Sequence, residues 1–477
     1  MMNPIVEENL VTFKEMEQII YAWICELGRA ITRIILEEFD DELAKGRDKK
    51  THRDKGKRVT SIKTVYGEVT YMRRVYKTKS PEGFTMYVYL LDQAIKLDRI
   101  GLISVNLAEM IADSVTVNTF RKGAKAISQT TGQTISHGGA WKLVQKLGER
   151  VTEEEEAEVS KFNAGEVSGS RNIDVLFEEM DGVWLKMQGP DHKRAPKQEM
   201  KVSTIYEGWD REKPNNLVGK KVLAGMETSD KFHDKREAQI ESIYDVSSIK
   251  YRILNGDGGS WIKDPYEPKT VFQLDAFHIR QEIKRKLNID EVARKEVERL
   301  YNAKKIDEML SFIRIYADSV DANDKNDTRA KKARELLSYL SNNYEGLKSY
   351  KDRIADLPAP PKGVIYKNMG VQENQNCTVI TLRMKGKRKR WSTKGANNMA
   401  KLLYRKENHE LSKTVNRYCE NIIFTLRLTE IAKGLTGAEA LREPGKRDSY
   451  YDKINMHVPM RDAAMTASRR ALLKALF

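Results

Sequence analysis

Three acidic residues stand in sequence contexts where a carboxylate can do chemistry. Asp181 lies within an apolar run, Asp257 precedes a pair of glycines, and Glu373 stands at the expected start of a helix. They are far apart in sequence, so only a fold can bring them together. Carboxylates gathered from separate segments can hold two divalent ions, which promote in-line displacement at phosphorus. Because Mg²⁺ prefers oxygen ligands and keeps positions open for water and phosphate, Mg²⁺ (or Mn²⁺) is the expected cofactor of a site with these three residues as catalytic metal ligands.

Each of the three residues also has a simpler interpretation. An Asp-Gly pair such as Asp181-Gly182 is usually a hairpin turn, but the next turn signal comes only at Gly189, which favours a strand running through Asp181. Asp257 could lie in a glycine-rich loop without chemistry, although ligands of open α/β sheets gather at strand ends of this kind. Glu373 could be a helix-start glutamate favoured by the helix dipole.

A D-x-x-H pair follows the next expected strand. Its members, Asp275 and His278, could support the metal site or organise DNA. The alternative is that Asp275 begins a helix, where aspartate is a favoured cap, and that His278 is simply packed against its neighbours. The sequence leaves both alternatives open.

A basic stretch follows Glu373, and beside the carboxylates it would neutralise DNA phosphates. Taken alone, a basic run is usually a solvated face. The aromatic residue that ends the stretch could stack on an exposed base or pack in the core. The predicted DNA-binding residues are Arg383, Lys385, Lys387, Arg388, Lys389, Arg390 and Trp391.

The elements that must position these residues alternate between strands and helices. Strands are expected at 172–187, 199–209 and 221–227, a helix at 230–248, and two more strands at 251–257 and 269–277. Three strands, a helix and two further strands is the order of the ribonuclease-H-like α/β fold. Charged helices should then fill 279–355, followed by a brief strand at 363–367 and a long helix over about 372–430.

The N-terminal part of the chain is expected to be mostly helical. A helix is predicted over 5–45, and its wide apolar stripe suits either a partner helix in a dimer or an ordinary core. A basic linker is expected at 46–60 and a small β-hairpin at 61–79. Helices should cover 88–150, with Ser136 as an N-cap, in a helix–turn–helix arrangement that suits DNA binding or plain packing. The regions 46–76 and 104–148 are equal candidates for reading DNA.

Composition narrows the class of partner. The chain has 477 residues and a net charge of +15, which favours a polyanion. No apolar run could span a bilayer and the N-terminus lacks a signal pattern, so no membrane partner is expected. Cys25, Cys377 and Cys419 are widely spaced and form no CxxC motif. This argues against a disulfide framework or zinc ribbon and fits a reducing cytoplasm.

Several short motifs together resemble a known family. They are residues 180–184 (MDGVW), 206–209 (YEGW), 256–262 (GDGGSWI), 274–278 (LDAFH), and Glu373 followed by the Arg383-Met384 pair and Trp391. In order and spacing the chain resembles the DDE insertion-sequence transposases of the ISLre-two group, relatives of the mutator-like superfamily. The resemblance implies a ribonuclease-H-like catalytic core whose Asp–Asp–Glu triad falls on Asp181, Asp257 and Glu373. It also implies a mostly helical insertion before the glutamate helix, and Asp275-x2-His278 is similar to the C/D-x-x-H signature of the relatives.

The function implied by this resemblance is DNA transposition, a form of DNA recombination. Expected partners are double-stranded DNA with terminal inverted repeats, target DNA and further copies of the chain in a homodimer or higher oligomer, in the cytoplasm at the nucleoid. A silenced copy that only binds DNA as a regulator, and a nuclease unrelated to transposition, are the alternatives; paired carboxylates of a glycosidase have little support from the charge. The expected regions are an N-terminal helix and basic linker (1–60), an α-rich DNA-binding region with the hairpin (61–165), a split core (166–278 and 363–477) and the insertion (279–362).

Overall fold

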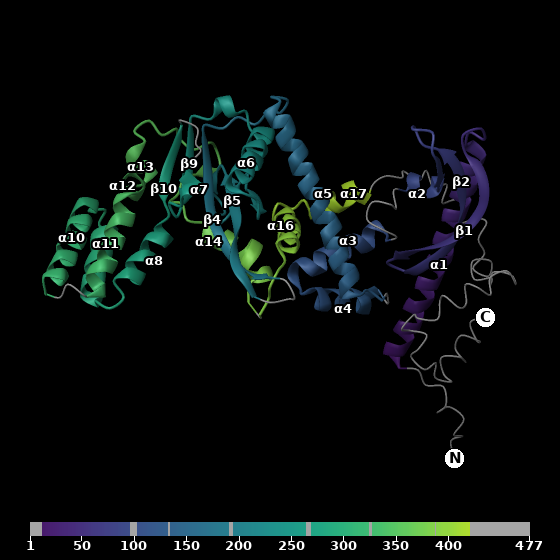
Figure 1. The fold of residues 1–477 in the computed structure, drawn as a ribbon, viewed down its shortest axis with the longest axis horizontal. Coiled ribbons are helices and arrows are strands. Elements are labelled where there is room, and N and C mark those ends of the chain that lie inside the picture. Colours follow the sequence, from purple (N-terminus) through teal and green to yellow (C-terminus); the bar gives the residue numbers. More distant parts are fainter. Residues whose placement is uncertain are drawn as a thin grey trace, which may run out of the picture. The chain divides into compact units, whose positions relative to one another are not determined.

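The computed structural model describes residues 12–95, 103–131, 134–189, 194–263, 269–323, 327–386 and 388–419. The chain forms two compact units, and Figure 1 shows their helices and strands, coloured along the sequence. The first comprises Met1–Leu147 and Glu410–Phe477, and the second comprises Gly148–His409. Among the described residues, no helix combines the length and apolar character that crossing a lipid bilayer requires.

The first unit begins with a long helix on a small sheet. Helix α1 (Phe13–Gly46) starts at a capping box formed by Thr12 and Glu15. Its C-terminal half packs through Leu36 against the sheet of β1 (Arg53–Thr64), β2 (Gly67–Lys79) and β3 (Thr85–Val88), which is antiparallel in that order. The predicted helix over 5–45 is therefore confirmed from residue 13, and residues 5–11 lie outside the described residues.

The predicted basic linker at 46–60 is wrong over most of its length. Strand β1 pairs with β2 from Arg53 opposite Lys77 to Thr64 opposite Gly67. The outer part of β1 is exposed, so its alternate positions carry charges rather than apolar side chains and the strand pattern is hidden. The predicted hairpin at 61–79 is also larger than expected, because β3 adds a third strand.

Helices complete the first unit. They are α2 (Leu90–Ala94), α3 (Val105–Val117), α4 (Phe120–Thr131) and the first part of α5 (His137–Asn163), and α17 (Leu411–Cys419) packs against α3. The backbone N–H of Gly139 donates to Ser136 Oγ at 2.9 Å, so the predicted N-cap is confirmed. The use of α4 and α5 in binding DNA stays a prediction.

The second unit is built on a five-stranded sheet. In sequence order its strands are β4 (Val175–Gln188), β5 (Arg194–Tyr206), β8 (Lys221–Gly225), β9 (Tyr251–Gly256) and β10 (Thr270–Leu274), with α6 (Ser229–Ile243) between β8 and β9. In space the order is β10-β9-β4-β5-β8. β4, β5 and β8 are antiparallel, whereas β9 and β10 run parallel to β4. The predicted succession of three strands, a helix and two strands is the one observed, apart from short added elements.

The two faces of the sheet are covered differently. Side chains alternate along β4. One face carries Glu178 and Met180 under α6, where Arg236 Nη1 lies 3.2 Å from Glu178 Oε2 and 2.9 Å from Met180 Sδ. The other face carries Phe177, which stacks on Tyr206 within an aromatic cluster. Three short strands, β6 (Gly208–Asp210), β7 (Leu217–Val218) and β11 (Val364–Ile365), form a second sheet in this unit.

Residues between β10 and β11 form a helical insertion beside β10 (Figure 1). Its apolar core includes Ile283, Val297, Met309 and Leu336. The helices are α8 (Ala276–Lys286), α9 (Glu291–Asn302), α10 (Ile306–Asn323), α11 (Thr328–Ser341), α12 (Tyr344–Leu347) and α13 (Tyr350–Arg353).

The predicted single helix over 372–430 is wrong. The segment consists of α14 (Gln372–Gln375), a π-helical turn (Asn376–Thr381) and α15 (Leu382–Met384), then a break, then α16 (Thr393–Glu407), and after a second break α17. In the break, Trp391 pairs with the end of β4: its N–H donates to Lys186 and its carbonyl accepts from Gln188. These backbone bonds to a strand are incompatible with a continuous helix. Residues 420–430 lie outside the described residues.

A buried ionic cluster attaches α16 to the sheet. Lys401 is fully buried, and its Nζ lies 2.7 Å from Glu227 Oε1 and 2.9 Å from Glu155 Oε2. Lys235 of α6 pairs with the same two carboxylates. Two cations therefore balance two anions, as buried charges require.

Candidate active site

Asp181 lies on β4, the central strand of the five-stranded sheet. The strand runs through the Asp-Gly pair without a turn, as predicted. Both carboxylate oxygens accept a hydrogen bond: Oδ1 from the Gly182 N–H at 2.7 Å and Oδ2 from Asn376 Nδ2 at 2.6 Å. A Cβ on Gly182 would lie 1.9 Å from Glu199 Oε1, so this position suits only glycine unless Glu199 moves. The residue is buried, with 8% of its surface exposed, and its carboxylate is held in one orientation.

Asp257 follows the neighbouring parallel strand, as predicted. Glu179 of β4 pairs with Asn255 of β9, so Asp181 and Asp257 each lie two residues further along, on the same side of the sheet. The Gly259 N–H donates to Asp257 Oδ1 at 2.8 Å, and Tyr339 of α11 donates its hydroxyl to the Asp257 carbonyl at 2.9 Å. The strand register thus brings two of the predicted acids to one place.

Glu373 lies in the first turn of α14 and is exposed. The helix start is fastened to the sheet by the buried carboxylate of Glu179, which accepts the N–H groups of residues 370–372 at 3.1–3.2 Å. Asn376, the donor to Asp181, lies three residues beyond Glu373 on the same helix. The helix that carries the third acid is therefore attached to the strand that carries the first.

Asp257 and Glu373 both lie within electrostatic range of Asp181. The pKa of Asp181 is raised to about 6, first by burial, and Asp257 and Glu373 add to the rise by like-charge repulsion. His278 and the Gly182 N–H act in the opposite direction. Within the described residues, no lysine or arginine makes an ion pair with any of the three acids. The group is thus an uncompensated concentration of negative charge.

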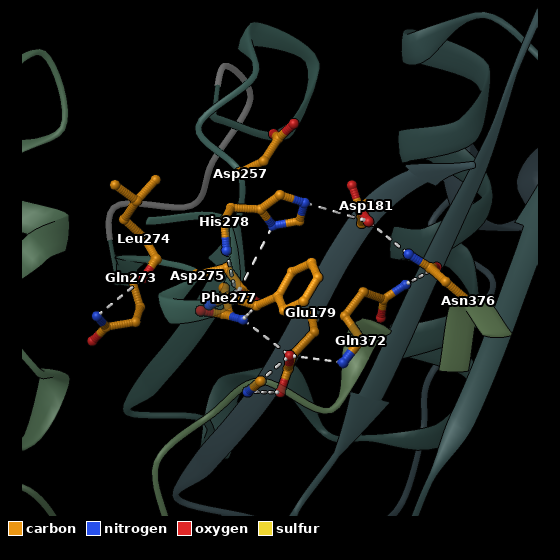
Figure 2. Close-up of polar contacts among 12 residues, drawn as sticks. Glu179, Asp181, Asp257, Gln273, Leu274, Asp275, Phe277, His278, Gln372 and Asn376 are labelled. Atoms are coloured by element: carbon orange, nitrogen blue, oxygen red, sulfur yellow. Dashed lines mark hydrogen bonds and ion pairs between the residues drawn. The ribbon is translucent and has the colours of Figure 1, made fainter. Parts of the chain in front are cut away.

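Asp275 and His278 lie beside this group. Asp275 caps a helix, as one alternative expected, and His278 lies near Asp181, as the other expected. Asp275 is the N-cap of α8 and accepts the N–H groups of Phe277 at 2.6 Å and His278 at 3.4 Å. His278 Nε2 lies 3.9 Å from Asp181 Oδ2, and Nδ1 lies 3.9 Å from Asp275 Oδ1. Figure 2 shows His278 and Asn376 approaching Asp181 from opposite sides.

The donor set fits a hard divalent cation. Asp181, Asp257 and Glu373 offer carboxylate oxygens, the ligands that Mg²⁺ and Mn²⁺ prefer, and the lack of a basic partner in the described residues leaves their charge for a metal to balance. Among the same described residues, no group of three or more His, Cys, Asp or Glu side chains lies close enough to hold an ion. The fit to a divalent cation therefore rests on the type of ligand, which is carboxylate oxygen, and not on a preformed set of ligands.

Three residues of the site were not anticipated from the sequence. Glu179 stands two positions before Asp181, and the period of a strand puts the two on one face, which is a signal that was available. Asn376 stands one helical turn after Glu373, a weaker signal. Glu199 of β5 is the third: burial raises its pKa, Lys201 opposes the rise and Asp257 adds to it.

The basic stretch divides into buried and exposed members. Arg383 is buried, its guanidinium lies 5.3 Å from the centre of the Trp391 ring, and burial lowers its pKa to about 10. The Trp391 indole N–H donates to the Met384 carbonyl at 2.9 Å, so this ring is held by the fold. Lys389 is half-buried, and its Nζ donates to the Arg383 carbonyl. The exposed cations are Lys385, Arg388 and Arg390, and Lys387 lies outside the described residues.

A family model described as "Uncharacterised protein family (UPF0236)" matches residues 6–418, most of the chain. The chain belongs to this family. The match spans all the elements that carry the acids and the basic stretch.

Similar proteins occur in Caldanaerobacter subterraneus subsp. tengcongensis. Three UPF0236 proteins of this organism are each 23% identical to the chain, over 386 residues in one case and 387 in the other two. The alignments cover 79% of this chain and 74%, 74% and 70% of the relatives. The name of the first joins eleven locus labels, and the name of the second joins four.

Proposed function

We propose that this protein is a DDE-type DNA transposase of an insertion sequence. Asp181, Asp257 and Glu373 would hold Mg²⁺ or Mn²⁺ and complete the catalytic site. The observation that carries the proposal is the gathering of Asp257, from the end of β9, and Glu373, from α14, around Asp181 of β4, without a basic partner in the described residues. Each acid alone has a structural explanation, but this gathering around Asp181 has none.

We also propose that the five-stranded sheet is ribonuclease-H-like. Its first strand in sequence, β4, is central; β5 and β8 extend the sheet on one side in antiparallel pairing, and β9 and β10 extend it on the other in parallel pairing. The register of the two strands puts the end of β9 beside the middle of β4, next to Asp181, and ligands of open α/β sheets bind at strand ends of this kind. The strands and helix between Asp181 and Asp257, and the insertion between Asp257 and Glu373, account for the separation of the three acids in the sequence.

The chemistry proposed is displacement at a DNA phosphodiester. Bound divalent ions would supply activation of the attacking oxygen and stabilisation of the leaving oxygen. Asp181 contributes a carboxylate whose orientation is fixed by Gly182 and Asn376. Hydrolysis at an element end would free a 3′-hydroxyl, and that hydroxyl would attack target DNA. Glu373 is exposed at the start of its helix, where DNA can reach it.

The proposed partners are double-stranded DNA with terminal inverted repeats, target DNA, and further copies of the chain on that DNA at the nucleoid. The net charge of +15 supports a polyanionic partner. The relatives supply an independent argument: one protein name that joins eleven loci of an organism is what repeated copying of a DNA element within its genome would leave.

The test is strand chemistry on the DNA that flanks the protein's own gene. Wild-type protein with Mg²⁺ or Mn²⁺ should nick the element ends and give joined products with a target plasmid, and chelation should stop both. Asp181→Asn, Asp257→Asn and Glu373→Gln should each lower the rate at least a hundredfold. Glu291→Gln, which removes an exposed acid of α9, should leave it unchanged. Full activity of the Asp181 and Asp257 variants would exclude the triad assignment.

A catalytically inactive DNA-binding protein derived from a transposase is the second candidate. The observation that favours it is the absence, among the described residues, of three His, Cys, Asp or Glu side chains close enough to hold an ion. Tight, salt-sensitive DNA binding without strand breakage in any divalent metal would establish this candidate instead. Breakage without joined products would indicate a nuclease.

A further inference from the structure

Glu179 is fully buried on β4, and five donors converge on its two carboxylate oxygens. The hydroxyl of Tyr206 donates at 2.6 Å, Asn255 Nδ2 donates at 3.0 Å, and the three N–H groups of residues 370–372 donate at 3.1–3.2 Å. Gly370 has φ +125°, a conformation that side chains rarely adopt, and it lets the chain turn so that successive N–H groups point at one carboxylate.

Asn255 joins this carboxylate to a second one. Its Nδ2 donates to Glu179 Oε2 at 3.0 Å and to Asp275 Oδ2 at 2.7 Å. The other oxygen of Asp275 caps α8, the helix that carries His278. One amide group therefore links two carboxylates, and each carboxylate holds the start of a helix that contributes a side chain to the site.

We propose that Glu179 and Asn255 are positioning residues of the active site. By fixing the starts of α14 and α8 to adjacent strands, they set how Glu373, on one helix, and His278, on the other, approach Asp181. The purpose assigned to this link rests on the proposed metal-dependent function. The link itself is a property of the fold that can be measured without any substrate.

A buried carboxylate such as that of Glu179 stabilises a sheet less well than apolar packing would. Burying a carboxylate is destabilising unless it is paired, and none of the five donors to Glu179 is a lysine or arginine. An apolar cluster with Phe177 and Ile253 already packs on the same face of the same strands. Local departures from efficient packing of this kind occur at functional sites. Here the departure lies two residues from Asp181.

Two variants and one matched control test the link. Glu179→Gln places an NH₂ group against N–H donors, and Asn255→Leu removes the donor shared by the two carboxylates. Asn408→Leu is the control. Asn408 is also a buried asparagine of the second unit, and its side chain donates to the Val222 carbonyl and accepts from the Val222 N–H. Asn255→Ser, smaller and still polar, replaces Asn255→Leu if that variant does not fold.

The first readout is hydrogen exchange of the amides of residues 370–372 in the full chain. Exchange should accelerate at least tenfold in both Glu179 and Asn255 variants and should stay at the wild-type rate in Asn408→Leu. The second readout is binding of Mn²⁺ alone, followed by electron paramagnetic resonance. Asn255→Leu should bind Mn²⁺ roughly 10–100-fold more weakly, the usual effect of losing a group that orients a metal ligand. Asn408→Leu should match wild type.

The outcomes separate this inference from the proposed function. Wild-type exchange at 370–372 in both variants overturns the inference, whatever the protein does with DNA. Accelerated exchange with unchanged Mn²⁺ affinity also overturns it, because the link would then hold helices without positioning the acids. If wild type neither binds Mn²⁺ nor cleaves DNA, the proposed function fails, and accelerated exchange still supports the role of Glu179 in holding α14.

Discussion

Asn376 Nδ2 donates a hydrogen bond of 2.6 Å to Asp181 Oδ2 from the helix that also carries Glu373. The other oxygen of Asp181 is occupied by the Gly182 N–H, so the carboxylate cannot rotate without losing a bond. The π-helical turn begins at Asn376, and such turns are frequent at functional sites. Asp181 is thus oriented by its surroundings before any ligand arrives.

Replacing Asp181 with asparagine should stabilise the metal-free protein at pH 7.5. The pKa of Asp181 is about 6 in the folded protein against an ordinary value of 3.8. The folded state therefore binds this proton more tightly, and the stability that it contributes is complete below pH 3.8 and lost as the pH rises through 6. Asp181→Asn, which never ionises, should exceed wild type at pH 7.5 by up to about 3 kcal/mol.

Urea unfolding of both proteins at pH 7.5 and pH 4, in the presence of a chelator, checks this prediction. The difference should close at pH 4, where wild-type Asp181 is protonated. A wild-type protein that is the more stable of the two at pH 7.5 would contradict the prediction, because the two hydrogen bonds to the carboxylate would then outweigh the cost of burying its charge.

Adding metal should reverse the order of stability. A ligand that binds only the folded state stabilises it by about 2.7 kcal/mol at a hundred times its Kd. Mn²⁺ should therefore raise the thermal midpoint of the wild-type protein but not those of Asp181→Asn and Asp257→Asn. Ca²⁺-free buffers and a titration of metal at fixed ionic strength distinguish specific binding from salt effects. Equal shifts in all three proteins would count against these acids as ligands.

Asn376→Asp should make the site strongly pH-sensitive. The new carboxylate would face Asp181 at hydrogen-bonding distance, and two carboxylates sharing a site cannot both ionise readily. Stability should fall by about 3 kcal/mol at pH 8 and recover by pH 5, where one shared proton suffices. Asn374→Asp adds the same charge to an exposed position of the same helix and should show neither effect. Unfolding midpoints at the two pH values give the answer.

The exposed cations of the basic stretch should contribute to DNA affinity by neutralising phosphates. Replacing Lys385, Arg388 and Arg390 with glutamine should reduce the slope of log affinity against log salt by about one for each phosphate that is no longer neutralised, or about three in total. A control triple in the insertion, Lys295→Gln, Arg299→Gln and Lys304→Gln, changes net charge equally. Fluorescence anisotropy over a salt series compares them, and equal slopes would locate the DNA elsewhere.

Lys401→Met should destabilise the second unit by about 3–5 kcal/mol at pH 7, because it leaves a buried negative charge uncompensated. The lysines hold the pKa of Glu227 at about 2 despite its burial. That carboxylate therefore contributes stability above its ordinary pKa of 4.5, which is lost as the pH falls through about 2. The effect of the substitution should narrow over the same range.

The control is Lys394→Met, which removes an exposed lysine of the same helix paired with Glu149 and should cost less than about 1 kcal/mol. Equal unfolding midpoints for the two variants at pH 7 would mean that the cluster gains nothing from Lys401.

The succession of strands and helices along the chain, and the element on which each acid lies, could be predicted because both depend on the pattern of neighbouring residues. The apolar run through Asp181, the strand ahead of Asp257 and the helix start at Glu373 are all short-range signals, and each element lies where it was expected. The convergence of the acids depends on strand register and on the insertion folding back, and no short-range pattern encodes either.

The misplaced elements share a physical cause. Strand β1 carries its charges on an exposed face, so its composition resembles a linker, and only pairing with β2 makes it a strand. The helix expected over 372–430 is interrupted because Trp391 finds backbone partners on β4. The strand period puts Glu179 on the face of Asp181, but its role depends on five donors from three separate segments, which only the fold brings together.

The insertion leaves and rejoins the sheet at nearly the same point. Asp275, where it begins, and Gly370, shortly after it ends, are joined through only Asn255 and Glu179. The chain between them is therefore a loop whose two ends lie close together. The free-energy cost of closing such a loop rises by only about 0.6 kcal/mol for each doubling of its length. A change in the length of this stretch therefore adds little closure entropy, provided that Tyr339 keeps its bond to Asp257 and Tyr350 its place in the aromatic cluster.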